Sequence, residues 1–286
     1  MYEWGWRVEE RRFGSTGPMV SVVGQGTWYI DKGDRAAAVA ALRRGIALGM
    51  THIDTAEMYD DAELVVGEAI AGQREQVFLV SKVMPHNASR RGTIAACEQS
   101  LRRLKTEYLD CYLLHWRGQN PLAETIAALD QVQCAGKIRS WGVSNFDVPD
   151  LEELRTLVGV ERLACNQVLY HLAERAIEHA VVPWCEAHDV AVVAYSPFGH
   201  GGFPGPRTSG GRVLAEIAEA HGAIPRQVAL DFLTRRAALF AIPKASNAEH
   251  AAENAGAGKL LLTEAELQSI DAAFPLGPPP RSLRML

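Results

Sequence analysis

Four reactive side chains lie at or just after the ends of short apolar runs, and their chemical types complement one another. Asp54, Lys82 and His115 each close such a run, and Tyr59 follows Asp54 by five residues. A phenol with a pKa near ~10 is a slow acid at neutral pH, but a nearby ammonium stabilises its anion and lowers that pKa. A carboxylate would hold the ammonium, and an imidazole would donate to a carbonyl oxygen. The set suits protonation of an oxygen while hydride arrives at its carbon.

Strand and helix patterns alternate along nearly the whole chain. The expected strands span 21–25, 52–54, 77–82, 109–115, 138–143, 164–168, 190–195 and 240–243. The expected helices span 34–48, 62–70, 93–104, 122–135, 148–157, 177–188 and 213–221, with another beginning near Pro225. A capping box at Thr263 opens a final helix that ends near Phe274.

Eight strands that alternate with helices predict an α/β fold, a (β/α)8 TIM barrel. We expect a single domain over residues 1–286, with an N-terminal hairpin and a C-terminal helix and tail. The carboxyl ends of parallel barrel strands share one face, so Asp54, Lys82 and His115 would meet there. The alternative, an open doubly wound sheet, predicts a Gly-x-Gly-x-x-Gly turn after a strand, and none follows a strand in this sequence.

Composition narrows the class of protein. The chain has 286 residues, 48% of them hydrophobic, and a formal net charge of −5, which gives no electrostatic signature of nucleic-acid binding. Five cysteines, with no Cys-x-x-Cys pair, indicate small core residues in a reducing compartment. Residues 1–12 lack the apolar core of a signal peptide, and no apolar run is long enough to span a membrane. We therefore expect a cytoplasmic protein without membrane or nucleic-acid partners, as a monomer.

Sequence blocks around the four residues resemble those of the aldo-keto reductases. The matching catalytic blocks are Ile-Asp-Thr-Ala-Glu-Met-Tyr at 53–59, Val-Ser-Lys at 80–82 and Leu-Leu-His-Trp at 113–116. Further matches are Gly-Gln-Gly-Thr-Trp at 24–28, Gly-Val-Ser-Asn-Phe at 142–146, Asn-Gln at 166–167, Ala-Tyr-Ser-Pro at 194–197 and Ile-Pro-Lys at 242–244. The similarity runs in unbroken order from about residue 22 to 254. Within the family it is closest to bacterial methylglyoxal reductase-type members.

This resemblance implies an oxidoreductase that reduces small aldehydes, α-dicarbonyls or ketones to alcohols with NADPH, and with NADH more weakly. It implies that Tyr59 is the general acid, that Lys82 and Asp54 tune it, and that His115 orients the carbonyl. The substrate would lie against Trp28, Tyr59, His115 and Trp116. A short loop after His115 and a tail of only a dozen residues argue for an open site and small substrates.

The resemblance also implies a set of cofactor contacts. These are Gly26, Thr27, Trp28, Asp54, Ser144, Asn145, Gln167, Tyr195, Ser196, Pro197, Phe198, Lys244, Ala245, Ser246, His250, Glu253 and Asn254. Two of them depart from the family pattern, because Ala245 replaces a hydroxyl residue and His250 replaces an arginine. Fewer charge-assisted hydrogen bonds would then reach the 2′-phosphate, so discrimination against NADH would be weaker.

Two other interpretations compete with this one. A barrel of this kind could be a non-catalytic subunit that senses redox state through bound cofactor, which would show tight NADPH binding and slow turnover. Lys82 could form a Schiff base, which borohydride would trap. The nine histidines form no metal-binding motif such as His-Glu-x-x-His, so metal catalysis finds no support.

The glycine-rich stretch 199–211 fits a flap over a ligand and an ordinary surface loop equally well.

Overall fold

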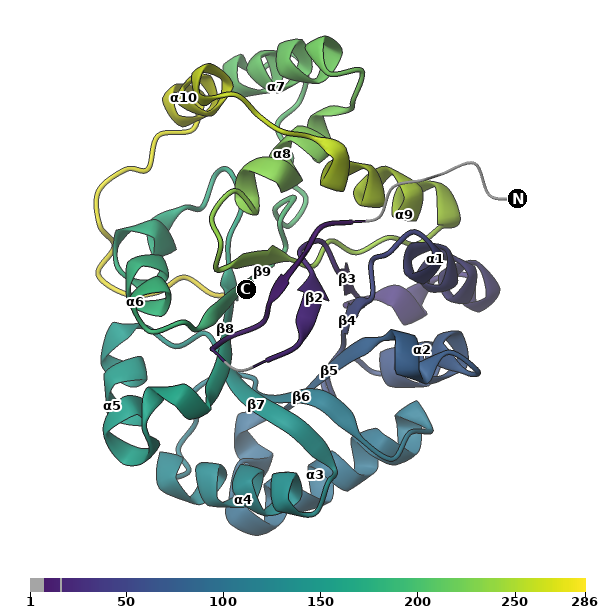
Figure 1. Ribbon diagram of the computed structural model, residues 1–286, viewed down its shortest axis with the longest axis vertical. Helices are drawn as coiled ribbons and strands as arrows, with labels where there is room; N and C mark the ends of the chain where they lie inside the picture. Colours follow the sequence, from purple (N-terminus) through teal and green to yellow (C-terminus); the bar gives the residue numbers. More distant parts are fainter. Residues whose placement is uncertain (1–7, 16) are drawn as a thin grey trace.

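The main element of the computed structural model, which describes residues 8–15 and 17–286, is a parallel eight-stranded sheet. Its strands follow one another in chain order, as the repeated strand and helix patterns predict (Figure 1). They are β3 (Gln25–Gly26), β4 (His52–Asp54), β5 (Phe78–Val83), β6 (Leu109–Leu114), β7 (Ile138–Ser144), β8 (Leu163–Leu169), β9 (Ala191–Tyr195) and β10 (Leu239–Ala241).

The first and last strands of this sheet also meet, so the sheet closes into a barrel. Val23 forms a parallel bridge with Ala241, and Gly26 forms one with Lys244. Glycine is required at position 26, since a Cβ there would lie 2.5 Å from the carbonyl oxygen of Ile242. The predicted (β/α)8 barrel is confirmed.

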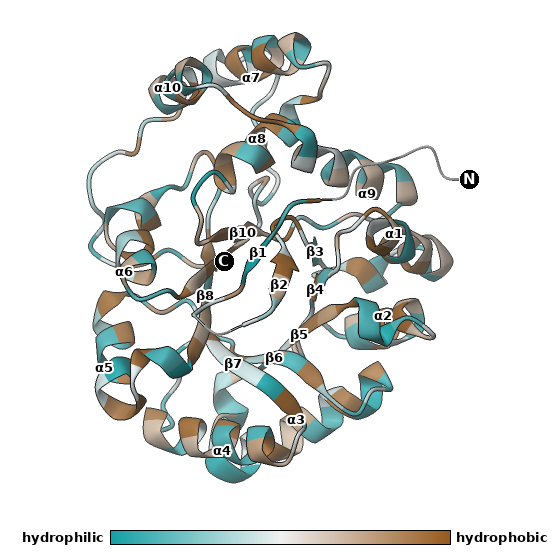
Figure 2. Ribbon diagram, viewed as in Figure 1, coloured by the Kyte–Doolittle hydropathy of each residue, from teal (hydrophilic) through white to brown (hydrophobic). Residues whose placement is uncertain are grey.

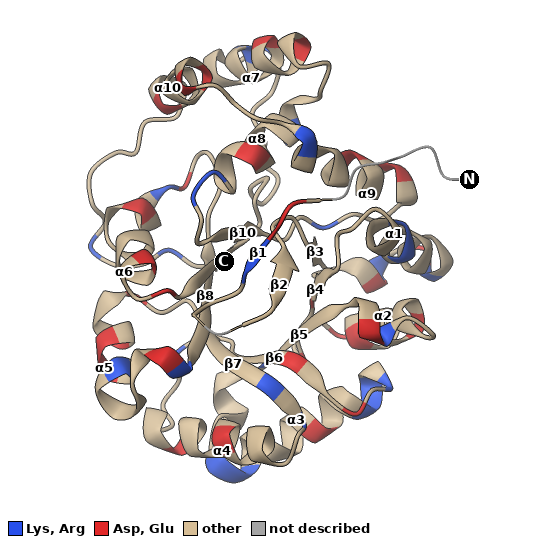
Figure 3. Cartoon of the chain, viewed as in Figure 1, with Lys and Arg blue, Asp and Glu red and all other residues tan. Residues whose placement is uncertain are grey.

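Helices surround the barrel and cover the outer face of its strands (Figure 1). They are α1 (Arg35–Ala47), α2 (Ala62–Ile70), α3 (Arg90–Leu104), α4 (Leu122–Cys134), α5 (Val148–Val158), α6 (Val181–Ala187), α8 (Pro225–Leu233) and α9 (Ala248–Ala255). Hydrophilic and hydrophobic residues alternate along them in Figure 2, and charges of both signs are interspersed on them in Figure 3. Their apolar sides pack on the barrel, which supplies most of the stability of such helices.

Two further helices, α7 (Ser209–Ala220) and α10 (Glu264–Ala273), pack on each other outside this ring. The predicted capping box opens α10: the side chain of Thr263 accepts from the backbone of Glu266, whose carboxylate accepts from the backbone of Thr263 at 2.7 Å. Pro225 occupies the first turn of α8, where its missing N–H costs nothing.

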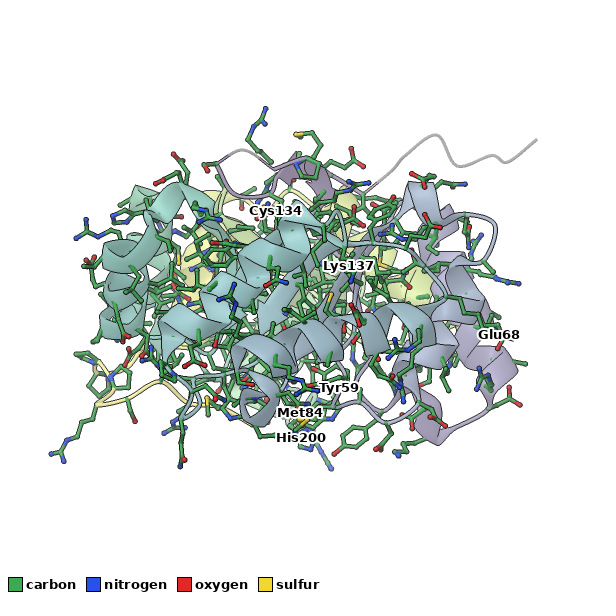
Figure 4. All side chains as sticks on the ribbon, turned by 90° about the horizontal axis from the view of Figure 1, so that it is seen from below. Tyr59, Glu68, Met84, Cys134, Lys137 and His200 are labelled. Atoms are coloured by element: carbon green, nitrogen blue, oxygen red, sulfur yellow. The ribbon has the colours of Figure 1, made fainter. Side chains whose placement is uncertain are left out.

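The predicted N-terminal hairpin is present and closes one end of the barrel. Its strands, β1 (Glu10–Arg12) and β2 (Met19–Ser21), pair antiparallel. Between them, Phe13 is buried with its ring centroid 4.8 Å from that of Phe78 and 5.2 Å from that of Phe240. In Figure 4 the purple hairpin lies at the top and Tyr59 lies at the opposite end. One barrel end is thus filled by the chain itself, which leaves the other for ligands.

Several predicted boundaries differ from the structure, three of them for clear physical reasons. The segment 177–188 is not one helix: a 3-10 turn at Ala176–His179 precedes α6, and Pro183 fits only in the first turn of a new helix. The glycine-rich loop ends at Thr208, whose side chain caps α7. Ser21 belongs to the hairpin rather than to the first barrel strand. No helix in the described part of the chain is long and apolar enough to cross a membrane.

Candidate active site

Adjacent barrel strands bring the carboxylate and the ammonium together. Asp54 ends β4 and Lys82 lies near the end of the neighbouring β5. The Lys82 ammonium donates to the Asp54 carboxylate and, at 2.8 Å, to the carbonyl oxygen of Thr55. Their side chains are 0% and 2% exposed. Because an unpaired charge at such a site would cost several kcal/mol, each partner needs the other.

The loop after β4 holds Tyr59 above this ion pair. Glu57 anchors the loop, since its carboxylate accepts from the backbone N–H of Met84 and from the side-chain amide of Asn87 at 3.2 Å. The Tyr59 hydroxyl lies 3.5 Å from the Lys82 ammonium nitrogen, and the same nitrogen lies 4.9 Å from the centre of the phenol ring. Phenol and ammonium are therefore close enough for direct electrostatic coupling.

Burial as well as the Lys82 ammonium sets the pKa of the Tyr59 hydroxyl. Burial raises the pKa of Tyr59, the positive charge of Lys82 partly offsets this, and Asp54 adds to the rise. The expected net lowering of the phenol pKa was therefore wrong. Burial also disfavours the charged form of Lys82, but the Asp54 carboxylate outweighs it and raises the pKa of the ammonium. At neutral pH the site holds a protonated phenol beside a charged lysine.

His115 lies beside Tyr59 and is uncharged. Its ring centroid is 5.7 Å from that of Tyr59, in an edge-on arrangement. Burial, assisted by the charge of Lys82, lowers the pKa of His115 to about 2. Its Nδ1 atom is buried and has no hydrogen-bond partner among the described residues. A neutral imidazole with unused hydrogen-bonding capacity is suited to contact a carbonyl oxygen.

Tyr59 and His115 line a cavity of about 330 Å³ at the open end of the barrel. Its walls include Trp28, Tyr59, His115 and Trp116, the four residues expected to contact substrate. The last two residues of the chain, Met285 and Leu286, also line it. The expectation that a short tail leaves the pocket open was therefore wrong, because the tail reaches the pocket despite its length.

Specific contacts guide the tail along this path. The Arg284 guanidinium lies 3.2 Å from the Glu174 carboxylate, and the carbonyl oxygen of Gly277 lies 3.1 Å from Nε2 of His179. The backbone of Leu286 lies close to the Tyr195 hydroxyl, and both residues line the same cavity. Figure 4 shows the yellow C-terminal segment running along the same end of the barrel as Tyr59.

The residues expected to hold the nicotinamide carboxamide are linked to one another. The Tyr195 hydroxyl donates to the side-chain oxygen of Asn145 at 2.9 Å, and the Asn145 amide donates to the Ser144 hydroxyl at 3.0 Å. Gln167 pairs with Ser144 on the neighbouring strand, its backbone oxygen accepts from the Asn145 N–H at 2.8 Å, and its side-chain amide donates to Asp54 at 2.7 Å. Thr27 is buried and donates to the backbone oxygen of Asp54 at 2.9 Å. Any carboxamide bound here would exchange partners with this network.

Two further cavities extend the site into a groove. A cavity of about 250 Å³ shares Trp28, Tyr59 and Tyr195 with the first one. A cavity of about 480 Å³ shares Phe198 and Lys244 with the second. The expected cofactor contacts that line these two cavities are Gly26, Thr27, Trp28, Asp54, Tyr195, Ser196, Pro197, Phe198, Lys244, His250, Glu253 and Asn254. An elongated groove with an amide cluster at one end and cations at the other fits a dinucleotide.

The far end of the groove lies on the surface. Lys244 is exposed and donates to the Ser246 hydroxyl at 2.6 Å. His250 is exposed in the first turn of α9, where its backbone N–H donates to the capping side chain of Asn247 at 2.8 Å. Ser144, Ala245 and Ser246 line none of the three cavities, and Ala245 is buried.

Sequence reasoning missed several residues of the groove. His200 stacks on Trp28 with ring centroids 5.3 Å apart, and Figure 4 shows it at the same end of the molecule as Tyr59. Met58 lines the substrate cavity, and Arg226 lines the cavity at the far end. The position of Met58 beside Tyr59 was a usable signal. Nothing local in the sequence marks Arg226, which comes from α8.

Comparison with known proteins agrees with this geometry. The model of the aldo/keto reductase family matches residues 22–274, which is most of the chain. The chain belongs to this family. As an aldo/keto reductase it is similar to the methylglyoxal reductase YeaE of Escherichia coli (strain K12), with 50% identity over 257 residues that cover 88% of this chain and 90% of that protein.

A second relative is less similar in sequence, and a third is known from its crystal structure. Glyoxal reductase of Bacillus subtilis (strain 168) is 33% identical over 251 residues, which cover 87% of each chain. The crystal structure of an aldo/keto reductase from Klebsiella pneumoniae in complex with NADP and acetate has a TM-score of 0.92 and 43% identity, and covers 98% of this chain and 100% of that one.

Proposed function

We propose that this aldo/keto reductase reduces small aldehydes, α-dicarbonyls and ketones to alcohols with NADPH, and that Tyr59 is the proton donor. One observation carries the proposal: a protonated phenol, 3.5 Å from a buried ammonium, shares a cavity wall with a neutral imidazole. Relatives that are a methylglyoxal reductase and a glyoxal reductase support α-dicarbonyls as substrates.

The proton transfer follows from the charge states of the four groups. His115 is neutral, so it can donate one hydrogen bond to the carbonyl oxygen and hold it beside Tyr59. NADPH, when bound, supplies a hydride to the carbonyl carbon. As the oxygen gains negative charge, Tyr59 gives up its proton to it, which completes the alcohol and leaves a phenolate. The Lys82 ammonium stabilises that phenolate, and Asp54 holds the ammonium in place.

The groove supports the choice of cofactor. Tyr195 lies on the wall shared by the substrate cavity and the groove, beside the Asn145 amide that would hold a carboxamide. The cations Lys244 and Arg226 line the far cavity, where phosphate groups would find charge-assisted hydrogen bonds. Solved relatives from Klebsiella pneumoniae were crystallised with NADP and with NADPH.

We also propose that the protein acts as a cytoplasmic monomer without nucleic-acid partners. In the described part of the chain all five cysteines are free and four of them are buried, as expected for small core residues in a reducing compartment. Charges of both signs are interspersed on the outer helices, which favours no polyanion.

NADPH consumption with a panel of carbonyl compounds tests the proposal. We expect kcat/KM for methylglyoxal and for a nitrobenzaldehyde to exceed that for a steroid ketone by a wide margin, and NADH to support lower rates than NADPH. Tight NADPH binding with no turnover of any carbonyl would instead favour a redox-sensing subunit. Trapping of a carbonyl substrate on Lys82 by borohydride would favour Schiff-base chemistry.

A further inference from the structure

The cavity at the far end of the groove holds a cation that the family pattern does not predict. We propose that Arg226, on α8, binds the 2′-phosphate of NADPH together with Lys244 and takes over the task of the arginine that His250 replaces. The assignment rests on the proposed function, because it concerns how the cofactor of that reaction is selected. Arg226, Lys244 and His250 line the same cavity of about 480 Å³.

Two aromatic rings hold the Arg226 guanidinium in place. Its central carbon lies 5.0 Å from the ring centroid of Phe203 and 5.6 Å from that of Phe198. The two rings meet edge to face, with centroids 5.7 Å apart. Both phenylalanines line the cavity and belong to the glycine-rich loop after β9. Such stacking restricts the side chain before a ligand arrives, which reduces the entropy lost on binding.

The hydrogen-bond donors of Arg226 have no acceptor among the described residues, whereas two other arginines that stack on a phenylalanine, Arg235 and Arg175, are neutralised by a carboxylate. Arg235 stacks on Phe232 at 3.8 Å and donates to the Glu178 carboxylate at 2.8 Å. Arg175 stacks on the same ring and donates to the same carboxylate at 2.7 Å. Those two arginines cross-link the fold. Arg226 is exposed at the cavity wall and forms no ion pair with a carboxylate in the described part of the chain.

Charge favours a phosphate as the missing partner. Arg226 and Lys244 are cationic side chains that line this cavity, and among the described residues Glu253 is the one carboxylate that lines it. A phosphate monoester carries nearly two negative charges above its second pKa, near ~6. A guanidinium can bind two phosphate oxygens at once through parallel N–H donors, an arrangement that an imidazole does not have. Arg226 therefore suits the 2′-phosphate better than His250 does.

Cofactor affinities measured by calorimetry test the assignment without reference to turnover. We expect Arg226→Ala to raise the Kd for NADPH roughly ten- to hundredfold and to change the Kd for NADH less than about twofold. The fragments 2′,5′-ADP and 5′-AMP should follow NADPH and NADH respectively. Arg226→Lys should fall between the parent and Arg226→Ala, because it keeps the charge and loses the paired geometry.

Two matched variants act as controls. Arg212→Ala removes another arginine with an exposed guanidinium, one that donates only to the backbone of Arg207, and should leave both affinities unchanged. His250→Ala should weaken NADPH binding less than Arg226→Ala does. Equal losses for NADPH and NADH in Arg226→Ala would show that the side chain only anchors the loop or contacts the adenine, and would overturn the assignment. So would an unchanged preference for NADPH. A parent chain that binds neither dinucleotide would overturn the proposed function itself.

Discussion

The two ends of the groove are constructed in opposite ways. At the catalytic end, Lys82 and Asp54 are fully buried and hydrogen-bonded, His115 is buried, and Tyr59 is partly buried beside them. At the phosphate end, Lys244 and His250 are exposed, with hydrogen bonds only to nearby polar groups.

Because one end is buried and the other is exposed, the two ends control different properties of the enzyme. Burial fixes the charge state of every group at the catalytic end, since moving one charge there changes the free energy of all the others. At the phosphate end water screens each cation, so one side chain can be exchanged at small cost. The family arginine could therefore be lost at position 250 without damage to the fold. The reaction should depend on the first end and the choice of cofactor on the second.

Lys82→Met should have the largest effect. Without the ammonium the phenolate left after proton transfer is not stabilised, so we expect kcat for methylglyoxal reduction to fall roughly a hundred- to ten-thousandfold. The free energy of unfolding should fall by about 3–5 kcal/mol, because Asp54 becomes a buried charge without a partner. Urea denaturation and steady-state kinetics measure the two effects.

A double variant distinguishes chemistry from folding at this site. Asp54→Asn combined with Lys82→Met removes both buried charges and should recover much of the lost stability while kcat stays low. Recovery of activity together with stability would mean that Lys82 serves the fold alone.

Removal of Met285 and Leu286 should have an intermediate effect. These residues line the substrate cavity, so their loss should raise the ratio of kcat/KM for a bulky aldehyde over that for methylglyoxal by roughly tenfold. Arg284→Ala, which keeps both residues and loses only the ion pair with Glu174, serves as the control. An unchanged ratio would show that the tail does not shape the pocket in solution.

His250→Arg should have a small effect, confined to the cofactor. A guanidinium can bind two phosphate oxygens at once, which an imidazole cannot, so the Kd for NADPH should fall a few-fold while that for NADH stays constant. kcat should not change. A large change in kcat would contradict the claim that the exposed end of the groove affects cofactor binding alone.

The smallest expected effect is that of pH on the chemical step. The pKa of His115 is lowered to about 2 and that of Tyr59 is raised, so neither group changes protonation between about pH 6 and about pH 9. With NADPH saturating, kcat/KM for methylglyoxal should vary less than about twofold over that range. A tenfold decline on the acid side with a midpoint near pH 6.5 would mean that His115 titrates normally.

The parts of this protein that could be predicted are those with local causes. Asp54, Lys82 and His115 lie at strand ends that short apolar runs reveal, and the order of the runs indicates a barrel. Thr263 reveals the start of α10 in the same way, because its capping partner is three residues away.

The parts that could not be predicted depend on contacts between distant segments. Leu286 reaches Tyr195 only because the tail follows Glu174 and His179 around the barrel. Arg226 lines the far cavity because α8 packs beside the loop after β9, where Phe198 and Phe203 contact its guanidinium. The raised pKa of Tyr59 has the same origin, since burial is a property of the folded chain that a pattern of residues does not reveal.

The central claim is that Tyr59 performs chemistry at the buried end while the exposed end independently binds cofactor. Tyr59→Phe tests it most directly, through the rate of methylglyoxal reduction and the Kd for NADPH measured on one preparation. We predict a loss of rate of roughly a hundred- to ten-thousandfold with a Kd within about twofold of the parent. A folded Tyr59→Phe variant that reduces methylglyoxal at nearly the parental rate would contradict the account.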